Sequence, residues 1–324
     1  PLVDWISRHE LVLFFACTML FSWGILAVAS QFSFENETTF NRIIAIAAYG
    51  PSLSAILLTA ITTTESRQKD SRLRIVWFLP FLLVLVAGIE WSNNIWWEHP
   101  FDQSLILADA ILVIVTAFVL YWLFIQRTEA SQKLLGAPPS RVKFVWYIAA
   151  FGLWPALILA GNAIARVLGL SVPPSPSWPD MPILIIVLQA FVWYLLFGGP
   201  LNEEPGWRGF ALPRLQNRFS PLIASIILGV IWGLWHVPEH LMGVYDGGAL
   251  GAAMRVMEIP RAILFTWLYN RTKGSLLIVL LFHTAINTTS SFLPRSVVIV
   301  FILCIVLAVA VVLKDKMWRR LPEV

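Results

Sequence analysis

Three short segments in the second half of this 324-residue sequence hold side chains suited to proton transfer. They read Asn202-Glu203-Glu204-Pro205-Gly206-Trp207-Arg208, His236-Val237-Pro238-Glu239-His240 and His283-Thr284-Ala285-Ile286-Asn287. Carboxylates and imidazoles act as general acids and bases, and imidazole and amide N–H groups stabilise oxyanions. Each segment adjoins or lies within an apolar run. An ionisable residue at membrane depth costs roughly 2.5–3.5 kcal/mol and is therefore a functional candidate.

The spacing within the segments predicts a role for several of these side chains. Glu204 and Arg208 are four residues apart, so on a helix they share a face and can pair. Glu203 points about 100° away around the same helix and remains available as a general base. His283 and Asn287 are also four residues apart, and both can donate hydrogen bonds to an oxyanion.

Each of these residues also has a purely structural interpretation. Asn202 is expected to cap a helix, and the glutamates after it would then form a solvated acidic helix start. His236 could be a buried histidine that is hydrogen-bonded to backbone. His283 and Asn287 could form polar contacts between membrane helices. Asp109, in an earlier apolar run, is expected to meet interface water or a helix partner.

The rest of the sequence must position these residues within a membrane. Apolar residues make up 58% of the chain and charged residues 13%, against about 25% in soluble domains. The mean hydropathy is +0.75. This composition excludes a soluble enzyme, a disordered chain and a fibrous repeat. It predicts an all-α, polytopic integral membrane bundle of about ten spans. The expected spans are 11–30, 43–62, 75–96, 104–125, 144–165, 181–199, 220–238, 252–269, 274–292 and 296–313.

The distribution of charge predicts the orientation in the membrane. Most of the 23 lysines and arginines fall in segments that share one side if there are ten spans. By the positive-inside rule, both termini face the cytoplasm, and we expect a plasma-membrane protein. Ala27-Val28-Ala29 resembles a signal-peptidase site, but the preceding apolar run is long, so a retained span is favoured. The basic segments lack interleaved aromatic residues, so the bilayer is an expected partner and nucleic acid is not.

Other hydrolytic chemistries fit the sequence less well. Residues 236–240 match the zinc-binding pattern H-x-x-E-H, but Pro238 interrupts the regular helix that this pattern needs. Cys17 and Cys304 lie in apolar runs without a neighbouring histidine. The segment around Ser52 lacks the second glycine of a nucleophile elbow.

Together the three segments resemble the CAAX-processing and bacteriocin-processing (Abi, or type II CAAX prenyl endopeptidase) family of intramembrane proteases. The family motifs E-E-x-x-x-R, F-x-x-x-H and H-x-x-x-N are matched, in order, by Glu203, Glu204 and Arg208; Trp232 and His236; His283 and Asn287. Trp232 stands where the family motif has phenylalanine. The resemblance covers roughly residues 185–292. The domains expected are 1–180, N-terminal spans of unassigned role; 181–292, the motif-bearing core; and 293–324, the last span and a basic cytoplasmic tail.

The resemblance implies a catalytic mechanism within an all-helical core whose cavity opens toward the cytoplasm. Glu203 and His236 would activate a water molecule for attack on a peptide carbonyl. His283 and Asn287 would stabilise the tetrahedral oxyanion. Glu204 and Arg208 would hold Glu203 in place, and Trp232 would have a supporting role.

Several alternatives remain open from the sequence. The resemblance implies hydrolysis without a bound metal. The residues would also suit a zinc metalloprotease in which Glu203, His236 and His283 hold zinc, with Asn287 as a weak fourth ligand. The expected substrate is a prenylated protein, a peptide or a bacteriocin leader. A non-catalytic membrane immunity or binding protein is a further alternative, as is a transporter, although we find no internal repeat.

Overall fold

The computed structural model describes residues 2–32, 37–63, 103–126, 128–174, 182–245 and 248–322. Every regular element among these residues is a helix. Seven helical segments in this part of the chain are long and apolar enough to cross a membrane, and Leu276–Phe292 is apolar but shorter. The predicted all-α, polytopic membrane class is therefore confirmed. The chain forms two compact units: unit 1 is Pro1–Leu135 with Leu196–Gly206, and unit 2 is Gly136–Leu195 with Trp207–Val324.

Two of the ten expected spans need separate comment. The span expected at 75–96 lies outside the described residues. The span expected at 252–269 is divided into several elements: α13 (Gly248–Ala253), the 3₁₀ turn η4 (Met254–Met257) and α14 (Glu258–Arg271). Three charged residues interrupt this apolar run, and its longest helix, α14, has only 14 residues.

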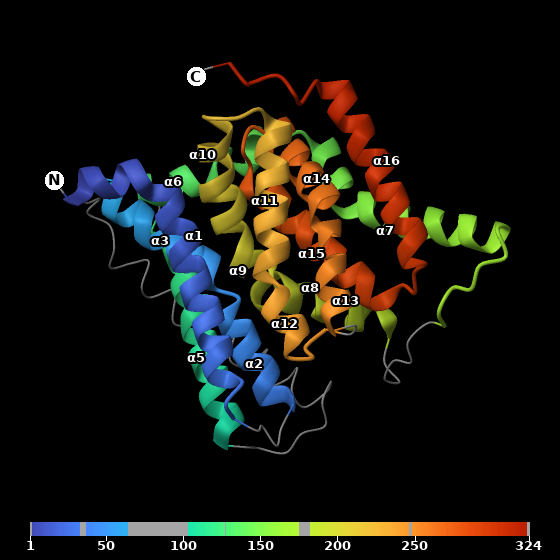
Figure 1. Ribbon diagram of the computed structural model, residues 1–324, viewed down its shortest axis with the longest axis horizontal. Coiled ribbons are helices and arrows are strands. Elements are labelled where there is room, and N and C mark those ends of the chain that lie inside the picture. Colours follow the sequence, from blue (N-terminus) through green and yellow to red (C-terminus); the bar gives the residue numbers. More distant parts are fainter. Residues whose placement is uncertain are drawn as a thin grey trace. The chain divides into compact units, whose positions relative to one another are not determined.

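Unit 1 is built on four helices that pack against one another (Figure 1). They are α1 (Leu2–Ala29), α2 (Glu37–Ala47), α3 (Gly50–Thr62) and α5 (Gln103–Leu120). The unit also holds the π-helix η1 (Tyr121–Ile125), α6 (Glu129–Leu135) and α9 (Pro200–Glu204). Gly50 lets α3 approach α1 closely, because a Cβ atom at this position would lie 2.9 Å from the backbone oxygen of Thr18.

A buried ion pair joins α2 to α5 within unit 1. Arg42 Nε donates to Asp109 Oδ1 over 2.7 Å, and only 3% and 5% of the two side chains are exposed. Removing either partner would leave a buried charge without its counter-ion, which is strongly destabilising. Asp109 therefore meets a helix partner, one of the two outcomes expected from the sequence.

Unit 2 carries most of the candidate site. Its helices are α7 (Phe144–Val167), α10 (Leu212–Gln216), α11 (Pro221–Trp235), α12 (Val237–Leu241), α13, α14, α15 (Leu276–Phe292) and α16 (Val297–Asp315). Helix α8 (Ile183–Phe197) belongs to unit 2 as far as Leu195, and its last two residues belong to unit 1. Helix α11 packs against α14, and α7 packs against α15 and α16 (Figure 1). A short 3₁₀ turn, η2 (Pro139–Arg141), precedes α7.

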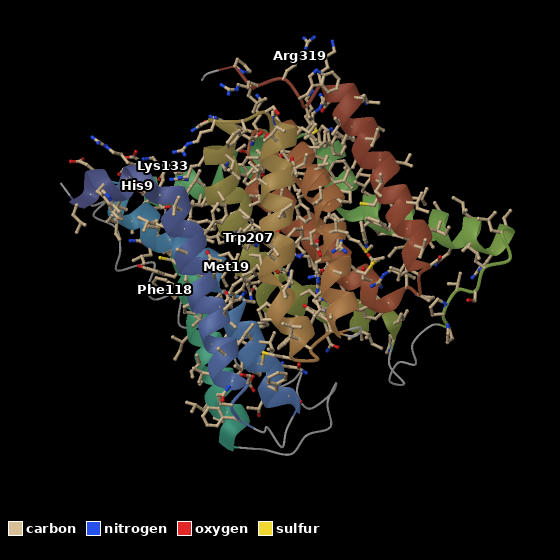
Figure 2. All side chains as sticks on the ribbon, viewed as in Figure 1. His9, Met19, Phe118, Lys133, Trp207 and Arg319 are labelled. Atoms are coloured by element: carbon tan, nitrogen blue, oxygen red, sulfur yellow. The ribbon has the colours of Figure 1, made fainter. Side chains whose placement is uncertain are left out.

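Large apolar side chains are exposed along the helices of both units. Phe118 on α5 points away from its neighbours (Figure 2) and is 47% exposed. Ile148 on α7 and Val306 on α16 are each 58% exposed. Soluble proteins rarely expose apolar patches of this extent, whereas hydrocarbon tails solvate such side chains well. The surface is thus that of an integral membrane protein.

Glycines on α11 allow a close approach to the segment that precedes and begins α14. A Cβ atom at Gly229 would lie 2.8 Å from Ile259 Cα, and one at Gly233 would lie 2.8 Å from the backbone oxygen of Arg255. Because these neighbours are backbone atoms, no rotamer change can make room. The two glycines are four residues apart, a spacing that brings membrane helices together.

Replacing Gly229 by alanine should destabilise the protein by about 1–3 kcal/mol, because the added methyl group would force α11 and α14 apart. Thermal unfolding in detergent micelles measures the effect. Gly152→Ala on α7 is the matched control, because a Cβ atom there meets nothing within 4 Å. Equal melting temperatures for the two variants would contradict this account of the contact.

Candidate active site

Both motif glutamates lie on α9, a five-residue helix of unit 1. The chain turns at Gly199, whose φ of +120° suits glycine, and Pro200 then opens the helix. Glu203 is 4% exposed and Glu204 is fully buried. The interpretation as a solvated acidic helix start is therefore wrong.

Asn202 does not cap this helix, so that prediction is also wrong. The helix starts two residues earlier, and Asn202 lies inside it. Its side-chain Nδ2 donates to the backbone oxygens of Ala45 and Phe197, each over 3.1 Å. The amide thus fastens the glutamate-bearing turn to α2 and to the end of α8.

Helix α3 holds the same turn from another direction. Ser52 Oγ donates to the backbone oxygen of Leu201 over 2.7 Å, so this serine has a structural partner and is fully buried. A Cβ atom at Gly206 would lie 2.5 Å from the backbone of Pro51. These contacts fix the backbone on both sides of Glu203 and Glu204.

A π-helix, η3 (Pro205–Ala211), follows the glutamates. The predicted pairing of Glu204 with Arg208 assumed the geometry of a regular α-helix, whereas π-turns bond residues five apart and occur frequently at functional sites. Glu204 belongs to unit 1 and Arg208 to unit 2. The pairing of these two residues stays a prediction.

In unit 2, the indole of Trp232 lies at the centre of the remaining motif residues. The fully buried guanidinium of Arg208 stacks over the rings of Trp232 and Phe265, with Cζ 4.5 Å and 4.1 Å from the two centroids. Such cation–π contacts stabilise a cation that has been removed from water. The side chain of Arg208 is therefore held between α11 and α14.

The two motif histidines also contact this indole. The ring centroid of Trp232 is 6.2 Å from that of His236 and 5.7 Å from that of His283. His236 follows Trp232 by one turn at the end of α11, whereas His283 comes from α15 and also contacts Phe265. The structure thus brings together His236, His283 and Arg208, which are far apart in the sequence.

Glu239 is a partner of His236 that the sequence analysis did not assign. Its Oε2 lies 2.6 Å from His236 Nδ1, and both side chains are more than nine-tenths buried. A carboxylate at this distance favours a proton on Nδ1 and leaves the Nε2 lone pair to accept another. The sequence feature that could have indicated this pair is Pro238, because a proline disfavours continuation of the preceding helix. In the structure α11 ends at Trp235, and the short helix α12 begins at Val237.

The zinc pattern H-x-x-E-H at residues 236–240 does not fit the observed geometry. Arg255 Nε donates to His240 Nε2 over 2.8 Å, which occupies the lone pair of that nitrogen. Glu239 holds His236 Nδ1, and His236 lies at the junction between α11 and α12, so the two histidines do not share one regular helix. Within the described residues, no three His, Cys, Asp or Glu side chains are grouped as a metal site. Binding of zinc by Glu203, His236 and His283 stays an untested alternative.

Asn287 follows His283 by one turn of α15 and lines a cavity of about 320 Å³ in unit 2. Ser290, a further turn along, lines the same cavity. An amide at this position can donate to a group that enters the cavity. Cys304 also lines the cavity, and both Cys304 and Cys17 are free cysteines.

The fold and these residues define a polytopic helical membrane protein with buried acid, base and hydrogen-bond-donor groups. Residues 184–289 match the family model described as type II CAAX prenyl endopeptidase Rce1-like. The chain is also 28% identical, over 184 aligned residues, to CAAX prenyl protease 2 of Methanococcus maripaludis. These findings confirm the resemblance that the motifs predicted: residues 184–289 are similar to the Rce1-like family. The alignment covers 51% of this chain and 64% of the length of that relative.

Arg208→Lys should lower the stability of the protein by about 1–2 kcal/mol, because an ammonium group cannot stack its plane between Trp232 and Phe265. The measurement is thermal unfolding in detergent. Arg218→Lys is the matched control, since Arg218 is exposed at the end of the α10 segment. An unchanged melting temperature for Arg208→Lys would show that the stacking contributes little.

Proposed function

We propose that this protein is an intramembrane endopeptidase that hydrolyses a peptide bond with a water molecule activated by Glu203 and His236. The observation that carries the proposal is the gathering of Arg208, His236 and His283 around the indole of Trp232. It is supported by the match to the Rce1-like family across 184–289, a segment that contains every motif residue.

The roles follow from the chemistry of each group. Glu203 accepts a proton from water, and the resulting hydroxide attacks the peptide carbonyl. His236, oriented through Nδ1 by Glu239, presents Nε2 to the same water. His283 and Asn287 donate hydrogen bonds to the oxyanion that forms. The proton then passes to the departing amine, which completes the hydrolysis.

The substrate class follows from the family name. A CAAX prenyl protease acts near a prenylated cysteine, and we propose a prenylated peptide or protein as the substrate of this chain. Because 13% of the residues are charged and many large apolar side chains are exposed, we expect the substrate to be presented from the bilayer. The basic segments support an orientation with both termini in the cytoplasm, and we propose a plasma-membrane location.

Glu203→Gln, His236→Ala and His283→Ala should each reduce hydrolysis of a farnesylated CAAX peptide by about 10²–10⁴-fold, because each removes a proton acceptor or an oxyanion donor. The measurement is release of the C-terminal fragment by protein in membranes. Glu129→Gln is the matched control, since the Glu129 side chain is 64% exposed on α6.

Full activity in all three variants would show that the site is misassigned. Absence of cleavage in the wild type, with a partner still bound, would instead favour the non-catalytic immunity or binding alternative. Chelation separates the zinc alternative: we expect activity to survive exhaustive dialysis against a chelator. Stoichiometric zinc that is lost together with activity would overturn that expectation.

Glu239→Gln should lower kcat by about 10- to 100-fold and leave KM nearly unchanged, because an amide orients His236 without stabilising its charge. Steady-state kinetics on the same farnesylated peptide separates the two constants. Glu239→Asp should recover part of kcat. A rise in KM without a fall in kcat would assign Glu239 to substrate binding.

A further inference from the structure

A second cavity of unit 2, of about 450 Å³, lies where the chain leaves α16. The end of α14 and the first residue of α11 also line it. Arg319, one of the lining residues, lies at this end of the unit (Figure 2). Five cations line the cavity: Arg271, Lys314, Lys316, Arg319 and Arg320. Asp315 is the one carboxylate among the described residues that line it.

This carboxylate is already engaged by one of the arginines. Arg271 Nε donates to Asp315 Oδ2 over 2.6 Å, and Arg271 Nη2 donates to the other carboxylate oxygen. Paired donors of this kind give guanidinium groups their strongest contacts with carboxylates. The other four cations make no ion pair with another described residue. The described residues therefore give the cavity a surplus of four positive charges, which suits an anionic ligand.

The backbone around the cavity is held in place before any ligand binds. Lys316 follows α16 in the left-handed conformation, with φ of +51°, which glycine adopts far more readily than lysine. Met317 is 3% exposed, and its backbone oxygen accepts a hydrogen bond from Leu222 N over 3.0 Å. The chain after α16 is thereby fastened to the first turn of α11. A lysine that keeps a costly backbone conformation on the wall of such a cavity indicates a use for its charge.

The surroundings of the cavity favour a lipid over a soluble anion. Val309 and Leu313, on the last turns of α16, are 51% and 60% exposed, and acyl chains would cover such a surface. Trp318 is 48% exposed just beyond the helix, and Trp267 lines the cavity itself. Tryptophan is enriched at the headgroup level of a bilayer. The cations are thus expected at the depth of lipid phosphates, next to an apolar helix face.

We propose that this cavity binds the phosphate of an anionic phospholipid from the cytoplasmic leaflet. Guanidinium and ammonium groups bind phosphate oxygens through charge-assisted hydrogen bonds, and the positive-inside rule places this basic end of unit 2 in the cytoplasm. At about 450 Å³ the cavity is within the range of ligand pockets, so a glycerol headgroup can enter with its phosphate. The lipid would join the ends of α14 and α16 to the start of α11. The inference goes beyond the proposed hydrolysis and does not depend on it.

Lipid titration followed by native mass spectrometry tests the proposal on the full chain in a neutral detergent. The probes are palmitoyl-oleoyl phosphatidylglycerol and the phosphatidylcholine with the same acyl chains, whose headgroup has no net charge. Phosphatidylglycerol should bind at least about tenfold more tightly. Lys316→Gly should weaken its binding about fivefold, because one cation near anionic lipid contributes roughly that factor. Adding Arg319→Gln should bring the loss to at least about tenfold and leave phosphatidylcholine binding unchanged.

Lys273→Gly is the matched control. Lys273 also has a left-handed backbone, with φ of +56°, and it does not line the cavity. Lys316→Gly and Lys273→Gly therefore each remove one charge and relieve the same backbone conformation, so both variants should fold. Lys273→Gly should keep the full affinity for phosphatidylglycerol.

Equal binding of the two lipids, or a phosphatidylglycerol preference that survives the double variant, would overturn the proposal. An equal loss of affinity in Lys273→Gly would show that overall charge alone attracts the lipid, and would overturn it as well. Displacement of phosphatidylglycerol by an equal concentration of sn-glycerol 3-phosphate would assign the cavity to a soluble phosphate instead. Peptide cleavage is measured separately, so failure of the endopeptidase function would be recognised on its own.

Discussion

The cost of removing charge from water governs this structure. In an apolar chain, a buried cation or carboxylate persists only where a partner or an aromatic face replaces its hydration. Arg42 has Asp109, Arg208 has the rings of Trp232 and Phe265, and Glu258 has two arginines. The first two compensations require helices to meet at a fixed place, so these charged groups also determine how the helices pack.

This constraint explains how the candidate site is organised within unit 2. Trp232 offers a rigid apolar surface that contacts a guanidinium and two imidazoles while carrying no charge itself. The tryptophan that replaces the phenylalanine of the family motif provides a larger surface for these three contacts. Glu239 then orients one of the imidazoles through a short hydrogen bond.

The helical class and the order of the motifs could be predicted from the sequence, because they depend on local patterns. Long apolar runs indicate membrane helices, and the four-residue spacing of Trp232 and His236 places them on one face of α11. Burial of the glutamates could not be predicted this way. It depends on the positive φ of Gly199 and on hydrogen bonds from Asn202 and Ser52 to distant backbone.

The same reasoning explains why Glu239 and the divided span were missed. Pro238 indicated an interruption of the helix, but the direction of the chain after it depends on tertiary packing. The apolar run at 252–269 was read as continuous, although its charged side chains pair with one another and with His240. Local patterns therefore predicted which residues matter better than how the backbone turns between them.

The lengths of α14 and α15 have a consequence for how the two helices are accommodated in a bilayer. Helices of 14 and 17 residues rise about 21 and 25 Å, less than the roughly 30 Å of a hydrocarbon core. Most residues of both helices are buried against other helices of unit 2, and irregular backbone at membrane depth is tolerated where protein rather than lipid surrounds it. Two helices too short to span the core can thus form part of the bundle, and one of them carries His283.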